Sequence, residues 1–194
     1  MLPPYLVTEL NKANVSPQSL EAIFQHASFL DIKNQAQLIR PGQVCDQIYF
    51  IMSGSFVCRY IDEDLEIEKA INFFMDDFHP FMSCVDSFFS GEKTRCELRA
   101  IAHSTVIALN KHKLESLINT DINLFRFYHS VVTTALQEEN DFKLKIISYT
   151  SEQLYQYLIS TFPMIIQRVP SRFIAEFMGI SPEWLSKLKH KFRY

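Results

Sequence analysis

The side chains best suited to chemistry lie near the C-terminus of this 194-residue chain, between Val169 and Tyr194. Two short helical patterns meet there at Gly179, a residue type that adopts the positive φ of a helix end at little cost. Ser181 can cap the second helix, and Pro182 suits its first position. A helix pair with such a turn and a polar, basic outer face is the plan of a helix-turn-helix that contacts DNA.

Apolar spacing predicts which faces of these two helices are buried. Ile174, Ala175 and Met178 form the apolar face of the first helix. Leu185 and Leu188 turn the second helix back onto the first. The side chains of the second helix that then face outward are Glu183, Ser186, Lys187 and His190.

Charge is divided between an acidic body and a basic C-terminal end. The whole chain has a formal net charge of −3, which by itself argues against nucleic acid. From Arg168 onward, six lysines and arginines face two glutamates, a local net charge of +4 that leaves −7 for the rest. A basic end on an acidic body can bind phosphate locally. The alternative is an amphipathic helical hairpin with a solvated lysine face.

Catalytic and metal-binding patterns are absent from the sequence. Cys45, Cys58, Cys84 and Cys96 are far apart and form no C-x-x-C pair, which favours buried apolar roles over a zinc or iron–sulfur site. The six histidines are dispersed, and no nucleophile motif or glycine-rich phosphate loop occurs. We therefore predict no enzyme activity, no metal and no cofactor.

The chain also lacks the sequence features of a membrane or secreted protein. No apolar run approaches the ~20 residues that a membrane helix requires. The N-terminal residues MLPPYLVTEL lack the charge and apolar pattern of a signal peptide. We expect a cytoplasmic protein without a membrane partner.

Short β-like runs follow one another in the first half of the chain, after a helix expected over 17–27 with Ser16 as its cap. The regular spacing of these runs predicts a small antiparallel barrel or sandwich. The acidic stretch 62–64 is expected at a hairpin tip. The predicted strands are QLIRPGQ, QIYFIMSG, SFVCRYI, EIEKAINFF and the segments 97–101 and 105–109.

Helical periodicity returns at 111–118 and continues in a long helix over 121–149. A helix this long has apolar surface left for a second copy of the chain, which predicts a homodimer. The alternative is a helix packed entirely on its own chain. The apolar residues of the predicted helix over 121–149 are Leu124, Phe127, Tyr128, Val131, Val132, Ala135, Leu136, Phe142, Leu144 and Ile147.

The boundary before the C-terminal helices is marked by a capping box from Thr150 to Gln153. The predicted fold class is therefore α+β, in three parts. An antiparallel β-roll with flanking helices covers 1–120, and a long dimerisation helix covers 121–149. A helix-turn-helix domain without a clear wing covers 150–194.

Taken in this order, the chain resembles the Crp/Fnr family of bacterial transcription regulators over nearly its whole length. The matching pieces are QLIRPGQVCDQIYFIMSGSFVCRYI, the long helix and VPSRFIAEFMGISPEWLSKLKHK. The match is strongest to the branch common in Bacteroidetes-like bacteria. The resemblance implies a cyclic-nucleotide-binding-like roll and a homodimer whose two recognition helices enter successive major grooves of double-stranded DNA.

The residues that hold cyclic AMP in the family are missing or displaced here. The family's Gly-Glu pair falls on Pro80 and Phe81, and its phosphate-gripping arginine falls on Thr94. Arg95 is one residue away, on the opposite face of a strand. The resemblance thus predicts no useful cyclic AMP binding. Two alternatives stay open for this region: a pocket for an unknown, less charged effector, and a cavity filled by phenylalanines. The candidate pocket residues are His79, Phe81, Ser83, Cys84, Thr94 and Arg95.

The DNA-contacting positions of the family transfer more directly. Matched on Gly179, the base-reading positions fall on Pro182, Glu183 and Lys187; a glutamate there accepts from cytosine N4, and a lysine reaches guanine or phosphate. Arg172 suits a backbone contact. Trp184 is expected to pack in the core against the first helix; the alternative is exposure to the sugar-phosphate surface. The other candidates are Ser181, Ser186, Lys189 and His190, with Lys191 and Arg193 in a basic tail that replaces the wing.

These residues together predict a sequence-specific, homodimeric DNA-binding transcription regulator of the Crp/Fnr type. The alternative is a small-molecule sensor or protein-interaction module whose C-terminal helices do not read DNA. The sequence specifies neither the operator nor the effector, and it leaves open whether the chain activates or represses.

Overall fold

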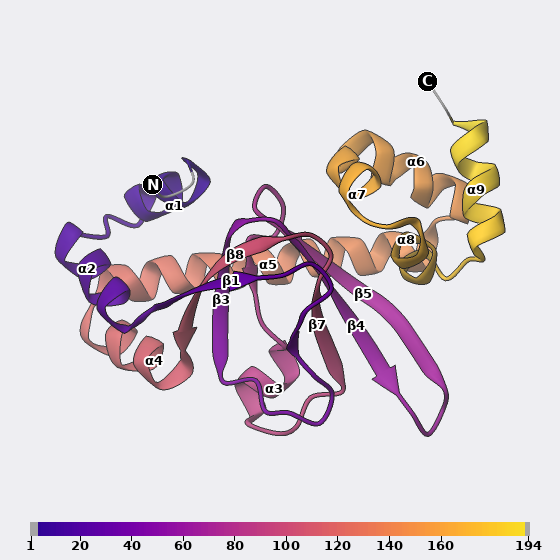
Figure 1. The fold of residues 1–194 in the computed structure, drawn as a ribbon. Coiled ribbons are helices and arrows are strands. Elements are labelled where there is room, and N and C mark those ends of the chain that lie inside the picture. The colour runs from indigo at the N-terminus through magenta and orange to yellow at the C-terminus, as the bar shows by residue number, and fades with distance from the viewer. Residues whose placement is uncertain (1–3, 193–194) are drawn as a thin grey trace.

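The computed structural model of the chain describes residues 4–192. An antiparallel β-roll occupies the centre, with the N-terminal helices at one end and the C-terminal helices at the other (Figure 1). The long helix α5 (Ile122–Ser148) runs behind the roll and reaches both groups of helices. The predicted α+β class and the order of roll, long helix and C-terminal helices are confirmed.

Two four-stranded antiparallel sheets form the roll, with strand orders β1-β8-β3-β6 and β2-β7-β4-β5. The first sheet contains β1 (Ser28–Ile32), β3 (Gln47–Ser53), β6 (Phe81–Met82) and β8 (Ser104–Asn110). The second contains β2 (Gln37–Ile39), β4 (Ser55–Asp62), β5 (Ile67–Met75) and β7 (Cys96–Ala100).

The predicted strand pattern is confirmed at six of these eight strands. Strands β1 and β6 were not expected, because β6 has only two residues and β1 has only a weak apolar pattern. The acidic stretch does lie at the β4–β5 turn, yet its first carboxylate is not simply solvated. Asp62 is buried and accepts hydrogen bonds from the Tyr60 hydroxyl at 3.0 Å and the Leu65 N–H at 3.2 Å.

Within the part of the chain that the structure describes, four helices accompany the roll. The predicted helix after residue 16 is α2 (Pro17–His26), and Ser16 caps it by accepting the Ser19 N–H at 3.1 Å. The second predicted helix is α4 (Lys111–Thr120). Helices α1 (Pro4–Lys12) and α3 (Val85–Ser90) were not predicted.

The C-terminal helices are α6 (Ser151–Thr161), α7 (Pro163–Arg168), α8 (Ser171–Met178) and α9 (Pro182–Lys191). The predicted capping box opens α6: the Thr150 N–H donates to Gln153 Oε1 at 2.9 Å, and the Gln153 N–H donates to Thr150 Oγ1 at 3.3 Å. Arg193, expected in the basic tail, lies outside the described residues. No helix within residues 4–192 is long and apolar enough to cross a membrane.

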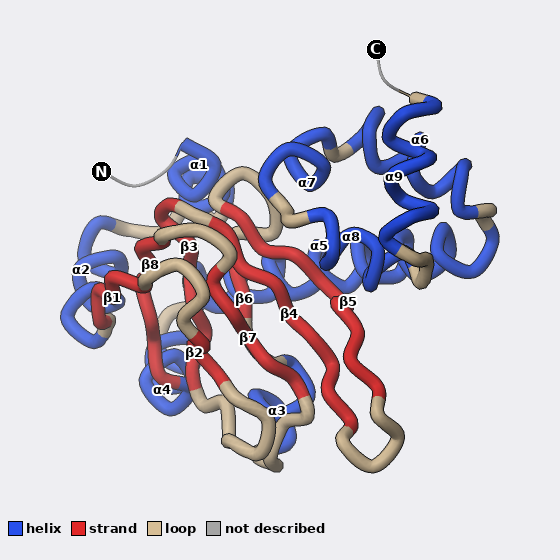
Figure 2. Tube along the Cα trace, turned by 45° about the vertical axis from the view of Figure 1, so that its right-hand side comes forward, coloured by secondary structure: helices blue, strands red, loops and turns tan. Residues whose placement is uncertain are grey.

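The roll and the C-terminal helices share one apolar core. The ring of Phe73 on β5 lies 5.3 Å from that of Phe177 on α8. Phe142 of α5 stacks on Phe162 at 5.1 Å and also meets Phe177. Figure 2 shows α8 beside β5, the edge strand of the second sheet. The helix-turn-helix is therefore held against the roll rather than separated from it.

Candidate DNA-binding surface and effector pocket

The turn between α8 and α9 has the geometry that its sequence predicts. Gly179 ends α8 with a φ of 65°, and the Ile180 N–H returns to the Ala175 carbonyl at 3.0 Å. Ser181 caps α9 by accepting the Trp184 N–H at 3.1 Å, and Pro182 takes the first helical position. These local bonds fix the direction in which α9 leaves the turn.

Burial divides α9 into the two predicted faces. Leu185 and Leu188 are each 1% exposed and pack in the core shared with α8. Lys189 is half-buried, and its ammonium donates to the Ser171 hydroxyl at 2.5 Å. The remaining predicted DNA-binding residues of this helix and its cap are all exposed: Ser181, Pro182, Glu183, Ser186, Lys187 and His190.

The exposed charges of α9 differ in how far they are already paired. Lys191 forms an ion pair with Glu152 of α6 at 2.8 Å. Lys187 has no such pair among the described residues; its ammonium lies 5.9 Å from the Trp184 ring. Hydrogen bonds from the backbone N–H of Glu183 and from the Ser181 hydroxyl hold the pKa of the Glu183 carboxyl below its usual value. The first turn of α9 thus offers an ionised acceptor, and the next offers an unpaired cation.

Trp184 does not lie where the sequence predicts it, and Arg172 makes contacts that the sequence does not predict. Trp184, expected in the core, is 38% exposed, and its indole Nε1 donates to Ser151 Oγ at 3.0 Å. The core-packing prediction was wrong because leucines already fill the inner face of α9. Arg172 is exposed, with its guanidinium 4.4 Å above the Phe173 ring and 3.5 Å from Gln35 Oε1 on the roll.

The six predicted effector-pocket residues do not form one site. Arg95 is 65% exposed at its side chain and pairs with Asp62 at 2.8 Å on the outside of the roll. Thr94 is buried, where its hydroxyl lies 3.2 Å from both carboxylate oxygens of Asp86 and accepts the Cys96 N–H at 2.9 Å. The Thr94 hydroxyl, at the position that the resemblance predicts to match the family's phosphate-binding arginine, therefore lies beside a carboxylate.

All four cysteines meet inside the roll, although they are far apart in the sequence. The Cys84 thiol hydrogen-bonds with those of Cys45 and Cys58, and Cys58 also with Cys96. The bond to Cys84 and burial raise the pKa of Cys45 above the usual range of a thiol. Burial was predicted, but the clustering was not. Within residues 4–192, no three or more His, Cys, Asp and Glu side chains are placed to hold a metal ion.

The other three predicted pocket residues, His79, Phe81 and Ser83, line a cavity of about 130 Å³ between the roll and α5. His79 stacks on Phe78 at 4.0 Å, and burial lowers the pKa of its imidazole to about 4. Its Nε2 lies 3.0 Å from Glu138 Oε2 but forms no hydrogen bond with that carboxylate or with any other described group. Burial raises the pKa of Glu138.

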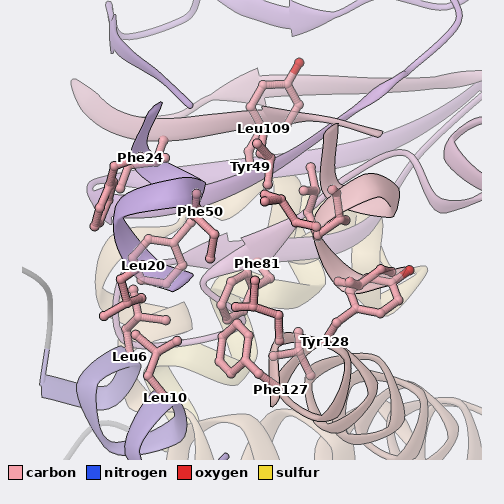
Figure 3. Close-up of a pocket in the computed structure, with 18 residues that line it drawn as sticks. Leu6, Leu10, Leu20, Phe24, Tyr49, Phe50, Phe81, Leu109, Phe127 and Tyr128 are labelled. Atoms are coloured by element: carbon pink, nitrogen blue, oxygen red, sulfur yellow. The ribbon is translucent and has the colours of Figure 1, made fainter. Parts of the chain in front are cut away.

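A second cavity was not predicted from the sequence. It lies on the other side of Phe81, between the roll, the N-terminal helices and α5 (Figure 3). Its walls are entirely apolar. The α5 residues that line it, Leu124, Phe127, Tyr128 and Val131, all belong to the apolar stripe identified in the sequence, but the stripe alone does not indicate a cavity.

Solved structures of other proteins share the fold of this chain, although sequence comparisons find no relative. No protein-family model matches the chain, and no curated protein has significant sequence similarity to it. Among solved structures, FixK2 from Bradyrhizobium japonicum is 15% identical with a TM-score of 0.69, covering 85% of this chain and 83% of that one. CLP from Xanthomonas campestris, described as a c-di-GMP responsive global regulator, is 16% identical with a TM-score of 0.70, covering 92% of each chain.

A third structure, a proposed transcriptional regulator of the Crp/Fnr family from Eubacterium rectale, is 10% identical with a TM-score of 0.68, covering 93% of this chain and 84% of that one. The chain therefore has the fold of Crp/Fnr regulators: a cyclic-nucleotide-binding-like roll, a long helix and a helix-turn-helix. These matches do not bear on the Bacteroidetes-like branch, which stays a prediction.

Proposed function

We propose that the chain is a cytoplasmic, homodimeric, sequence-specific DNA-binding transcription regulator of the Crp/Fnr type. The observation that carries this proposal is the surface of α9. Its buried leucines fix one face on α8. Its opposite face exposes Glu183 and, one turn later, Lys187, which has no ion pair within residues 4–192. Side chains at the N-terminal end of a recognition helix are those that reach base edges in the major groove.

The roles within this surface follow from the chemistry of each group. Glu183 stays ionised and can accept from the N4 amino group of a cytosine, and Lys187 can donate to a guanine or a phosphate. Ser186 and His190 are exposed nearby and suit phosphate contacts. The exposed Ser181 can join them when its hydroxyl exchanges its hydrogen bond to Glu183 for a phosphate oxygen. Arg172 can join them when its weak 3.5 Å contact with Gln35 is exchanged for a phosphate.

The proposed homodimer rests on the outer face of α5. The predicted apolar stripe divides into two faces of the helix. Leu124 and Phe142 are buried against the chain, whereas Leu136, Leu144 and Ile147 are exposed, with Ile147 at 72%. An apolar row of this kind on a long helix suits pairing with its symmetry mate.

The proposed effector domain does not use cyclic AMP. A cyclic phosphate needs a cation and N–H donors, but Thr94 and Asp86 offer a hydroxyl and a carboxylate in its place. Pro80 has no N–H to donate. Burial of an unpaired phosphate beside a carboxylate would be unfavourable.

Selection from a pool of randomised duplexes tests the proposal. The full chain is bound to the pool at two salt concentrations, and the bound DNA is sequenced. We expect enrichment of a palindrome with half-sites about one helical turn apart. Fluorescence anisotropy on the enriched site should then give binding that Lys187→Ala weakens about tenfold or more.

Lys113→Ala is the matched control, because Lys113 is an exposed lysine on α4, away from α9. It removes the same charge and should leave the affinity for the enriched site unchanged. Equal losses in both variants would indicate only general charge attraction. Unchanged affinity in a Glu183→Ala, Lys187→Ala double variant would favour the alternative function, a sensor or protein-interaction module whose C-terminal helices do not read DNA.

A further inference from the structure

The apolar cavity of Figure 3 has a volume of about 100 Å³. Its walls come from α1, α2, α4 and α5 and from strands β3, β6 and β8. Every residue that lines it is a leucine, isoleucine, valine, phenylalanine or tyrosine. The aromatic part of the wall includes Phe50 and Phe81, whose rings lie 4.9 Å apart, and Phe127, 5.9 Å from Phe81.

The wall chemistry restricts what the cavity can hold. No polar atom of the lining residues faces the cavity, and the hydroxyl groups of Tyr49 and Tyr128 point away from it in Figure 3. A charged or hydrogen-bonding ligand would leave its polar groups unpaired, which is costly. An apolar cavity of about 150 Å³, somewhat larger than this one, stays free of water and accepts molecules such as benzene or xenon.

Packing gives such a ligand its driving force. Protein interiors contain few voids larger than a water molecule, because atoms that line a void lose contacts on one side. A small apolar molecule restores those contacts and leaves water at the same time. The gain requires no rearrangement of charged groups, since none lies in the wall.

We propose that this cavity is a binding site for a small, uncharged, apolar molecule of about the size of one aromatic ring or a short alkyl chain. The site is distinct from the interior of the roll, and its occupation does not depend on DNA binding. Its wall includes Leu124, Phe127 and Val131 from the inner face of α5. The outer face of the same helix carries the exposed Phe125 and Leu136. A ligand that fits one position of α5 better than another shifts the helix toward that position.

Thermal unfolding of the full chain with toluene as the probe tests the site. We expect toluene to raise the Tm by about 3–6 °C at a concentration roughly tenfold above its Kd. Benzoate, which has a similar ring and a negative charge, should give no shift, because the wall offers its carboxylate no partner. The absence of a toluene shift in the unaltered chain would overturn the proposal.

Two wall variants locate the binding. Leu117→Phe on α4 fills the cavity and should abolish the toluene shift. Val131→Thr keeps the shape of the side chain, adds a hydroxyl to the wall and should reduce the shift even if the larger substitution does not fold. Leu65→Phe makes the same leucine change in the exposed β4–β5 turn and should retain the full shift. A full toluene shift in both wall variants would assign the binding to another place and reject this site.

Discussion

The imidazole of His79 is kept neutral by burial, which lowers its pKa to about 4 from 6.5. A lowered pKa means that the unfolded chain binds a proton at a pH where the folded chain does not. The stability associated with neutral His79 is therefore fully present above about pH 6.5 and is lost as the pH falls toward 4. Between about pH 7 and about pH 5 we expect a loss of roughly 2 kcal/mol, which urea unfolding at both pH values would measure.

The variant His79→Asn isolates this effect. Asparagine tolerates the φ of 49° found at this position, and its amide does not titrate. The raised pKa of Glu138 acts in the opposite direction, stabilising the fold as the pH falls, and it is present in both proteins. The expected result is a smaller loss of stability in the variant. An equal loss in both would mean that the close Glu138 carboxylate cancels the effect of burial on His79.

Residue environments were the part of the site least accessible from the sequence. The prediction for α9 succeeded at Leu185, Leu188 and Lys187, because helical spacing alone separates inner from outer positions. It failed at Trp184, whose indole bonds to Ser151 on another helix. The cysteine cluster could not be predicted from the sequence either. Cys58 and Cys96 are brought together by the pairing of two strands that lie far apart in the chain, and no local sequence motif indicates that pairing.

Helix α5 carries two apolar faces with different partners. One packs on the roll and lines the apolar cavity, and the other is exposed at Phe125, Leu136, Leu144 and Ile147. We expect Leu136→Glu to raise the dissociation constant of the dimer at least tenfold, about 1.4 kcal/mol, because it places a charge in an apolar contact. Analytical ultracentrifugation over a range of concentrations measures this constant.

Ser130→Glu is the matched control for the dimer, since it adds the same charge at an exposed position of α5 away from the row of apolar side chains. It should leave the dissociation constant nearly unchanged. A monomer at every concentration in the unaltered chain would refute the proposed pairing and leave the outer face of α5 without that role.

At the scale of elements, the sequence was informative wherever a pattern extended over several residues. Alternation and turn signals located the β2–β5 strands, and a capping box located the start of α6. Short elements such as β6 and α3 escaped prediction, because two to six residues carry too little periodicity. The long helix was predicted correctly. The spacing of its apolar residues, however, does not show which of them pack on the roll and which are exposed for another partner.

In the whole molecule, ion pairs hold the C-terminal helices on the roll. Arg59 on β4 pairs with Glu176 on α8 at 3.1 Å and lies over the Phe173 ring at 5.6 Å. Arg168 at the end of α7 pairs with Asp76 and Asp77, each at 2.7 Å. These partners lie far apart in the sequence, and nothing in the local pattern identifies them. The order of roll, long helix and C-terminal helices was therefore predictable, while the contact between the roll and the C-terminal helices was not.

Arg168 makes the clearest test of this contact, because its guanidinium also donates to the Gly54 carbonyl at 2.8 Å. Arg168→Ala removes these charge-assisted bonds from partly buried partners and should lower the free energy of unfolding by about 2 kcal/mol. Backbone hydrogen exchange should accelerate more in α8 than in β8, because α8 packs on the second sheet and β8 belongs to the first. Arg40→Ala, at an exposed arginine beside β2, should change neither quantity. Uniform acceleration across α8 and β8 would mean that Arg168 stabilises the molecule as a whole, and that the shared apolar core alone holds the helix-turn-helix against the roll.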